Sequence, residues 1–129
     1  MPSAHEDLPQ EVRRFILTSI PSVPFLEALL LMRGDNTHPW DAHRLAQALY
    51  TRKRVAADLL RELCESDIAQ PAGANNFAYR PGTPELAQRL DALAISYSKN
   101  LVAVTDLIHS RLERRAQQFA DAFRWKKED

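Results

Sequence analysis

Apolar side chains recur every three or four residues through most of the chain, which is the period of an amphipathic helix. The first such stretch ends where Pro21 and Pro24 interrupt it. The second is apolar around most of its circumference and stops at Gly34, a residue suited to a left-handed helix cap. The pattern predicts a short amphipathic helix and then a central core helix. Their apolar positions are Leu8, Val12, Phe15, Ile16 and Ile20, then Phe25, Leu26, Leu29, Leu30 and Met32.

Two further helices are predicted close together in the middle of the chain. Asp41 is well placed to cap a helix of barely two turns, which ends at Tyr50. Thr51 is placed to cap the following helix, which keeps a 3.6-residue rhythm as far as Glu65. Only a tight turn therefore separates these two helices.

The helical period is lost after residue 67. Apolar and polar residues alternate on either side of a break at 72–76, which predicts a small β-hairpin over residues 68–81. Thr83 or Pro84 then opens a long helical stretch, because no glycine or proline follows Pro84. We expect a continuous helix from about 84 to 123, with 95–98 as the place where it would bend.

The chain of 129 residues fits one domain whose core needs neither a disulfide nor a metal. Cys64 is the only cysteine and lies at helical spacing from Leu60, so it is expected to fill the core. Redox sensing and an intermolecular disulfide are the lesser alternatives for this thiol. No apolar run approaches the roughly 20 residues that span a bilayer, and the N-terminus lacks a secretory pattern. A cytoplasmic protein without a membrane segment is expected.

The predicted order is helix, short helix, tight turn, helix, hairpin and long helix. This order resembles the winged helix-turn-helix of bacterial transcriptional regulators, broadly the MarR and PadR type. The sequence that carries the resemblance is LAQALYTRKRVAADLLREL at residues 45–63, followed by Ser66-Asp67-Ile68. The resemblance covers roughly half of the chain. Tyr50 departs from the pattern, because the family usually has glycine in the turn, where a β-carbon costs about 1 kcal/mol.

The resemblance implies a mainly α-helical fold with a small β-hairpin. Residues 1–21 would be an N-terminal helical extension, 22–83 the winged helix-turn-helix, and 84–129 a long helix for dimerisation. Within the module, residues 52–65 would form the recognition helix in the major groove. The hairpin at 68–81 would be the wing, close to the DNA backbone.

A local excess of positive charge supports DNA as the partner. The formal net charge of the chain is zero, yet five basic residues and one acidic residue lie between Arg44 and Arg61. Positive charge in the first turn of a helix opposes the helix dipole, and DNA phosphate would relieve this cost. The alternative is an ordinary solvated helix face. The residues expected to contact DNA are Arg44, Thr51, Arg52, Lys53, Arg54, Asp58, Arg61, Asn75, Asn76 and Arg80.

Several other side chains have a structural interpretation. Phe77 and Tyr79 share one face of the hairpin and are expected to pack it against the core. Trp40 is expected to pack beneath the short helix, and Trp125 is expected at an interface. His38 and His43 lie near Asp41, but no fourth ligand is close in the sequence, so no metal is expected.

The long helix needs a partner surface for its apolar stripe. A homodimer through the C-terminal helix is expected, and folding back into a helical hairpin is the rival. Residues 110–129 mix basic and aromatic residues and form a possible protein-binding segment. The sequence therefore predicts a dimeric regulator that binds double-stranded DNA, with a winged-helix adaptor without DNA binding as the alternative. No paired carboxylates, cysteine–histidine arrangement or phosphate loop points to an enzyme, and no cofactor is expected.

Overall fold

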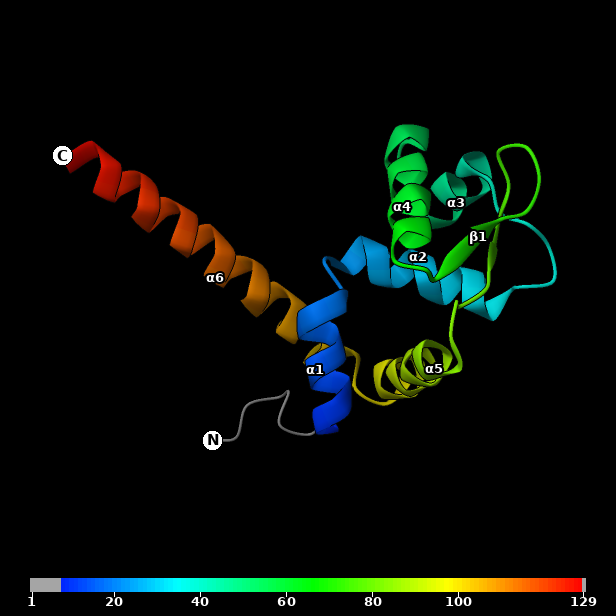
Figure 1. The fold of residues 1–129 in the computed structure, drawn as a ribbon, viewed down its shortest axis with the longest axis horizontal. Helices are drawn as coiled ribbons and strands as arrows, with labels where there is room; N and C mark the ends of the chain where they lie inside the picture. Colours follow the sequence, from blue (N-terminus) through cyan, green and yellow to red (C-terminus); the bar gives the residue numbers. More distant parts are fainter. Residues whose placement is uncertain (1–7, 129) are drawn as a thin grey trace.

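The computed structural model describes residues 8–128, with side chains described as far as Ala122. The fold is mainly helical, with one small antiparallel sheet of two strands (Figure 1). The expected interface at Trp125 and the first residues of the N-terminal extension lie outside the described side chains. The elements in chain order are α1 (Gln10–Ser19), α2 (Val23–Gly34), α3 (Ala42–Leu49), α4 (Lys53–Glu65), β1 (Ala69–Pro71), β2 (Phe77–Tyr79), α5 (Pro84–Lys99) and α6 (Leu101–Glu128).

The central helix α2 begins and ends differently. Its start is set by Ser22, whose side-chain oxygen accepts a hydrogen bond from the Phe25 amide at 3.2 Å. Its end is set by Asp35, which has an extended φ of −133° and donates its amide to the Leu31 carbonyl. The prediction of a left-handed cap at Gly34 is wrong, because the chain leaves the helix through Asp35 and Gly34 keeps a negative φ.

The core surrounds α2. Leu26, Ala28 and Leu29 are fully buried, and Phe25 and Met32 are nearly so. The helices α3 and α4 and the hairpin lie on one side of α2, whereas α1, α5 and the start of α6 lie on the other (Figure 1). The helix that the sequence predicts as central to the core is therefore central in the structure.

The predicted continuous helix over 84–123 is wrong, because Asn100 divides it into α5 and α6. Asn100 adopts an extended φ of −149°, and its side-chain oxygen accepts a hydrogen bond from the Ala103 amide at 3.2 Å. The start of α5 agrees with the prediction, since Thr83 caps it through the Leu86 amide at 3.1 Å. The break lies just beyond the predicted bend at 95–98.

The break allows α1 to contact both α5 and α6. Much of the apolar stripe expected to face a partner is consequently buried inside the same chain, at Leu90, Leu93, Val104 and Ile108, each 0% exposed. Leu101 and Leu112 of the same stripe remain 51% and 40% exposed. Beyond this region α6 extends away from the body as a lone helix (Figure 1).

Among the described residues, no single helix has both the length and the hydropathy for crossing a bilayer. The pair α1 and α2 meets the composition criterion together, but it is bent by 112° at its break.

The hairpin is closed by a tight approach between Gly82 and Asp67. The Gly82 amide donates to the Asp67 carbonyl at 2.9 Å, and a Cβ atom at residue 82 would lie 1.7 Å from Oδ2 of Asp67. Asp67 itself has a left-handed φ of 63°. The carboxylate of Asp67 is held against this glycine by a hydrogen bond from Gln70 at 2.9 Å.

We expect Gly82→Ala to destabilise the fold by roughly 1 to 2 kcal/mol, because the new Cβ displaces the Asp67 carboxylate. The matched control is Gly34→Ala, which meets no atom within 4 Å and should stabilise the fold by about 0.5 to 1 kcal/mol. Urea unfolding of both variants measures these changes. Asp67→Gly in the Gly82→Ala background should recover most of the loss, and a double variant no more stable than Gly82→Ala would contradict the clash.

Candidate nucleic-acid interface

The helices α3 and α4 are joined by a three-residue turn. Asp41 caps α3 as predicted, since its side-chain oxygen accepts from the Arg44 amide at 2.8 Å. Tyr50 follows in the left-handed conformation, with φ 55° and ψ 45°. The Thr51 amide then donates to the Ala46 carbonyl at 3.0 Å. The turn that the sequence predicts is confirmed, including the conformation that glycine would favour at position 50.

The predicted cap of α4 is wrong. The residue before the helix is Arg52, not Thr51, and its side chain makes no capping hydrogen bond. The reason is that the left-handed Tyr50 and the extended Arg52, with φ −77° and ψ 147°, together lengthen the turn by one residue. The N-terminus of α4 consequently lacks a side-chain cap, so its first amides stay available to an acceptor from outside.

Small residues let α3 and α4 approach closely. Ala46 is 7% exposed and Ala56 is 0% exposed, so each faces the other helix or the core. Leu59 and Leu63 fill the space beneath them and are also buried. This packing fixes the direction in which the first turn of α4 projects.

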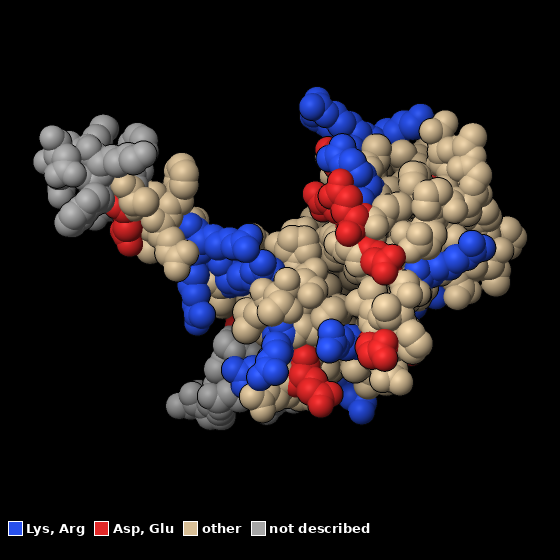
Figure 2. All heavy atoms as spheres, viewed as in Figure 1, with Lys and Arg blue, Asp and Glu red and all other residues tan. Residues whose placement is uncertain are grey.

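The start of α4 carries the basic cluster, which we define as Arg52, the residue before the helix, and Lys53 and Arg54 of its first turn. All three are exposed, and none makes an ion pair with any described residue. Figure 2 shows basic side chains gathered at this end of α4 and acidic side chains further along the helix. The first turn holds no acidic residue, so the positive charge there opposes the helix dipole without local compensation.

The charge of α4 changes along its length. Arg61 is paired with Asp58 at 3.3 Å and with Glu65 at 3.8 Å. The charges of these three side chains compensate one another on an exposed surface. The predicted contacts Asp58 and Arg61 therefore differ from the basic cluster, whose charges are not compensated. The free positive charge of α4 is confined to its N-terminal turn.

Arg44 is engaged within the protein. Its guanidinium stacks over the Trp40 ring at 3.6 Å from the ring centroid and forms an ion pair with Asp35. It also donates to the Pro39 carbonyl at 3.2 Å. Sequence spacing does not indicate the ion pair, since Asp35 lies nine residues away in a loop. Arg44 therefore holds the loop before α3, with its charge already matched by a carboxylate.

The hairpin is anchored to that same loop through Trp40. The Trp40 amide donates to the Phe77 carbonyl and the Phe77 amide donates to the Trp40 carbonyl, both at 2.8 Å. The indole Nε1 of Trp40 donates to the Asp35 carbonyl at 2.8 Å. Phe77 and Tyr79 are half-buried against the core, as predicted, and Trp40 is 4% exposed.

Of the three predicted hairpin contacts, Asn75 and Asn76 lie together in the turn and Arg80 lies apart from them. Asn75 is exposed at the tip with a left-handed φ of 61°, and Asn76 is half-buried in the same turn. Arg80 is exposed at the base, where its amide donates to the Ile68 carbonyl at 3.0 Å. A three-residue strand of about 10 Å separates the tip from the base. Only Arg80 contributes charge.

The remaining sequence candidates have ordinary surroundings. Cys64 is half-buried, and burial, followed by the charge of Glu65, raises the pKa of its thiol, which disfavours the reactive thiolate. In the described part of the chain, His38 and His43 belong to no group of three metal-binding side chains. Thr37 lies 2.9 Å from Nδ1 of His38.

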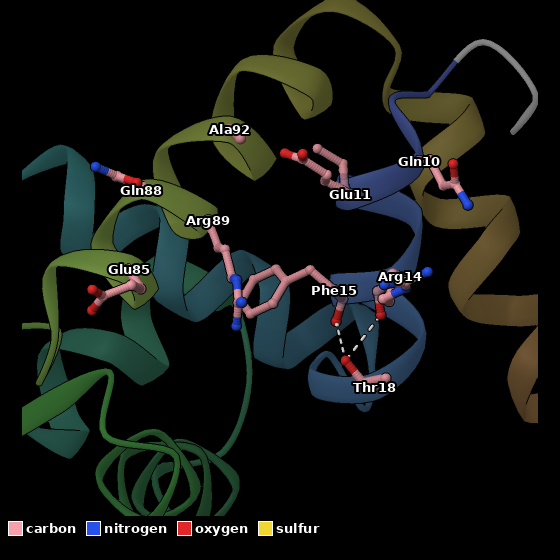
Figure 3. A pocket seen from close by; sticks show the side chains of 10 residues that line it. Gln10, Glu11, Arg14, Phe15, Thr18, Glu85, Gln88, Arg89 and Ala92 are labelled. Atoms are coloured by element: carbon pink, nitrogen blue, oxygen red, sulfur yellow. Dashed lines mark hydrogen bonds between the residues drawn. The ribbon is translucent and has the colours of Figure 1, made fainter.

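A cavity that the sequence did not reveal lies between α1 and α5 (Figure 3). Its volume is about 560 Å³, and its lining includes Phe15 and charged side chains of both signs. Those charges are Glu11 and Arg14 from α1, and Glu85 and Arg89 from α5. Because it forms where two helices distant in sequence meet, no local spacing could indicate it.

We expect the loop before α3 to respond to acid through Asp35. Hydrogen bonds from Thr37 and Arg44 hold the pKa of Asp35 below its ordinary value of 3.8. Because this folded-state pKa is depressed, the ionised carboxylate stabilises the fold at neutral pH, and this contribution is lost as pH falls through the depressed pKa. Asp35→Asn should therefore lower the melting temperature at neutral pH, by a difference that shrinks below pH 3.8.

Thermal unfolding across this pH range measures the effect. Asp121→Asn is the control, because Asp121 lies on the exposed outer part of α6. A gap between Asp35→Asn and the unsubstituted protein that stayed constant down to the lowest pH would contradict the role given to Asp35.

No family model, curated protein or solved structure shows significant similarity to the chain.

Proposed function

We propose that the protein is a DNA-binding regulator in which α3, the turn at Tyr50, α4 and the β1–β2 hairpin form a winged helix-turn-helix. The observation that carries the proposal is the basic cluster of Arg52, Lys53 and Arg54. These side chains are exposed, lack any acidic partner among the described residues, and occupy the first turn of a helix fixed against α3.

The chemistry of this turn matches the duplex backbone. Arginine and lysine neutralise phosphates, arginine also pairs with guanine in the major groove, and uncapped helix amides donate hydrogen bonds to an anion. The acidic residues Asp58, Glu62 and Glu65 follow along α4. Phosphate would be repelled by that half of the helix, so α4 would enter the groove by its first turn and not lie lengthwise in it.

The hairpin plays the part of the wing in this proposal. Its contribution is modest, because Arg80 is its one basic residue and lies at its base. The bridge between Trp40 and Phe77 supports the proposal by tying the hairpin to the loop that begins α3. Both would then reach the duplex as one unit.

A homodimer through α6 is the second part of the proposal. Most of the stripe expected from the sequence is used within the chain, but its member Leu112 also belongs to a second, partly apolar stripe of α6, which we call the outer stripe. Its members are alternately three and four residues apart, the spacing of a coiled coil. The outer stripe is Val102, Thr105, His109, Leu112, Ala116 and Phe119.

The exposure of apolar side chains in the outer stripe supports the proposal that a partner covers this face. Val102 is 65% exposed, Leu112 is 40% exposed and Phe119 is 75% exposed. A lone amphipathic helix is marginal in water, whereas a second copy would cover this face along its length. Two copies would also present two basic clusters to one duplex, as two-fold regulators do with paired half-sites.

An adaptor that holds another protein is the second candidate. The observation that favours it is the same exposed end of α6, from residue 110 onward, where Phe119 stands among charged residues. The acidic half of α4 is a further surface that would repel DNA and suit a basic partner. In this function the basic cluster would have no duplex to bind.

We expect the protein to bind duplex DNA in a salt-dependent manner. Replacing Arg52, Lys53 and Arg54 together by alanine should lower the affinity at least roughly tenfold and reduce the slope of log affinity against log salt by about 2 to 3. Fluorescence anisotropy with a labelled random-sequence duplex measures both quantities.

The matched control removes three exposed positive charges elsewhere, at Arg14, Arg89 and Lys99. It should leave both the affinity and the salt slope nearly unchanged. If both triple variants lost affinity equally, the effect would be one of net charge and not of the basic cluster. If the unsubstituted protein did not bind the duplex at low salt, the proposed function would be refuted.

We expect Leu112→Glu with Phe119→Glu to convert the dimer to a monomer, because two charges would enter the outer stripe. The control, Gln117→Glu with Gln118→Glu, adds the same charge beside the stripe and should remain dimeric. Sedimentation equilibrium measures the mass. All four positions are exposed, so folding of the body should be unaffected. A monomeric unsubstituted protein, or a dimeric stripe variant, would contradict pairing through α6.

A further inference from the structure

Tyr50 combines an unfavourable backbone with complete exposure. It has a φ of 55°, in the left-handed region where a side chain with a β-carbon is strained. Its side chain is also 97% exposed, the highest value among the exposed large apolar residues. A large aromatic ring is thus held in water by a conformation that glycine or asparagine would adopt more easily.

The backbone of Tyr50 closes the turn, but its side chain gives the fold no contact in return. The Tyr50 hydroxyl makes no hydrogen bond to any described residue, and the ring is not part of the core. The other residues with positive φ have local reasons for it. Asp67 accepts a hydrogen bond from Gln70, Asn75 is of a type that tolerates the conformation, and Gly73 has no side chain. The left-handed backbone of Tyr50 serves the turn after α3, whereas its side chain makes no contact that supports the fold.

The position of Tyr50 connects it to the basic cluster. It ends α3 and precedes Arg52 by two residues, so it lies at the meeting point of the two helices. A left-handed residue reverses the chain there and projects its side chain outward beside the first turn of α4. Any duplex that contacts Arg52 and Lys53 would lie within reach of the phenol.

We propose that Tyr50 is a DNA-contact residue, whose phenol donates a hydrogen bond to a phosphate oxygen beside the groove that α4 enters. This assignment rests on the proposed DNA-binding function. Tyrosine hydroxyls are among the groups that bind DNA phosphates, and a phosphate oxygen is an acceptor that needs no change in the charge of the phenol. The strain at position 50 is then the cost of placing a donor at this edge of the interface.

The proposal predicts opposite changes in stability and binding. Tyr50→Gly should raise the melting temperature by about 2 to 4 °C, because the strain is removed. The same variant should bind the labelled random-sequence duplex roughly tenfold more weakly, through loss of a hydrogen bond to a charged group. Its salt slope should equal that of the unsubstituted protein, since a neutral phenol displaces no counterion.

Tyr50→Phe separates the hydroxyl from the ring. It should leave the melting temperature unchanged, because the backbone strain remains, yet lose most of the affinity that Tyr50→Gly loses. Ile95→Ala is the matched control at an exposed apolar position on α5, 54% exposed, and should bind as the unsubstituted protein does.

The outcomes separate this inference from the function on which it rests. If the unsubstituted protein binds the duplex, the basic-cluster variant loses affinity and the Tyr50 variants do not, DNA binding stands and the role of Tyr50 is overturned. If Tyr50→Gly binds weakly but is less stable than the unsubstituted protein, the residue serves the fold and the inference also fails. If the unsubstituted protein binds no duplex at low salt, both proposals fall together.

Discussion

The burial of α2 is the constraint on which the rest of the structure depends. A helix that is apolar around most of its surface needs cover on every side, and Leu26, Ala28 and Leu29 are in fact fully buried. The cover comes from α3, α4 and the hairpin on one side and from the α1–α5–α6 group on the other (Figure 1). An ion pair between Arg33 and Asp91 at 3.0 Å joins α2 to α5. The basic cluster is thus held by α3 and α4, and the position of these two helices is set by their packing against α2.

The same demand for cover explains why the long helix is divided. Had residues 84–123 stayed straight, α1 could not contact both halves, and Val12, Phe15 and Ile16 would lose part of the surface that buries them. Turning at Asn100 folds the first stripe of α6 inward. Arg111 secures this arrangement by donating to the Ile20 carbonyl at 3.0 Å, at the end of the segment that follows α1. Only after this contact does α6 leave the body.

Local chemistry in the sequence predicted much of the fold. The caps at Asp41 and Thr83, the turn at Tyr50 and the hairpin each depend on residues within a few positions of one another, so spacing alone indicates them. The failures have a different origin. The caps expected at Gly34 and Thr51 failed because each helix boundary lies one residue further along, at Asp35 and Arg52. The break at Asn100 lets α1 contact both α5 and α6, and a periodicity of 3.6 is the same on both sides of a break.

The candidate interface shows the same division. The basic cluster was visible as consecutive letters, and its exposure agrees with the expectation. The sequence does not distinguish Arg44, whose charge is paired, from the unpaired basic cluster, because its partners Asp35 and Trp40 approach it only when the loop is folded. By contrast, Asp58 and Glu65 lie at helical spacings from Arg61 and match its charge, so the sequence itself indicates this pairing. The cavity between α1 and α5 left no local trace.

The two hydrogen bonds between Trp40 and Phe77 give the hairpin a mechanical role beyond its own contacts. They pair Trp40 with Phe77 of β2 as an isolated antiparallel bridge, and Trp40 is the residue just before the α3 cap at Asp41. The hairpin is therefore joined to the residue before the α3 cap by main-chain hydrogen bonds, and α3 is joined to α4 by the short turn at Tyr50. Moving the hairpin away from α3 would break both of these hydrogen bonds and leave buried backbone groups unpaired, so the two elements hold one relative orientation only while this pair is intact.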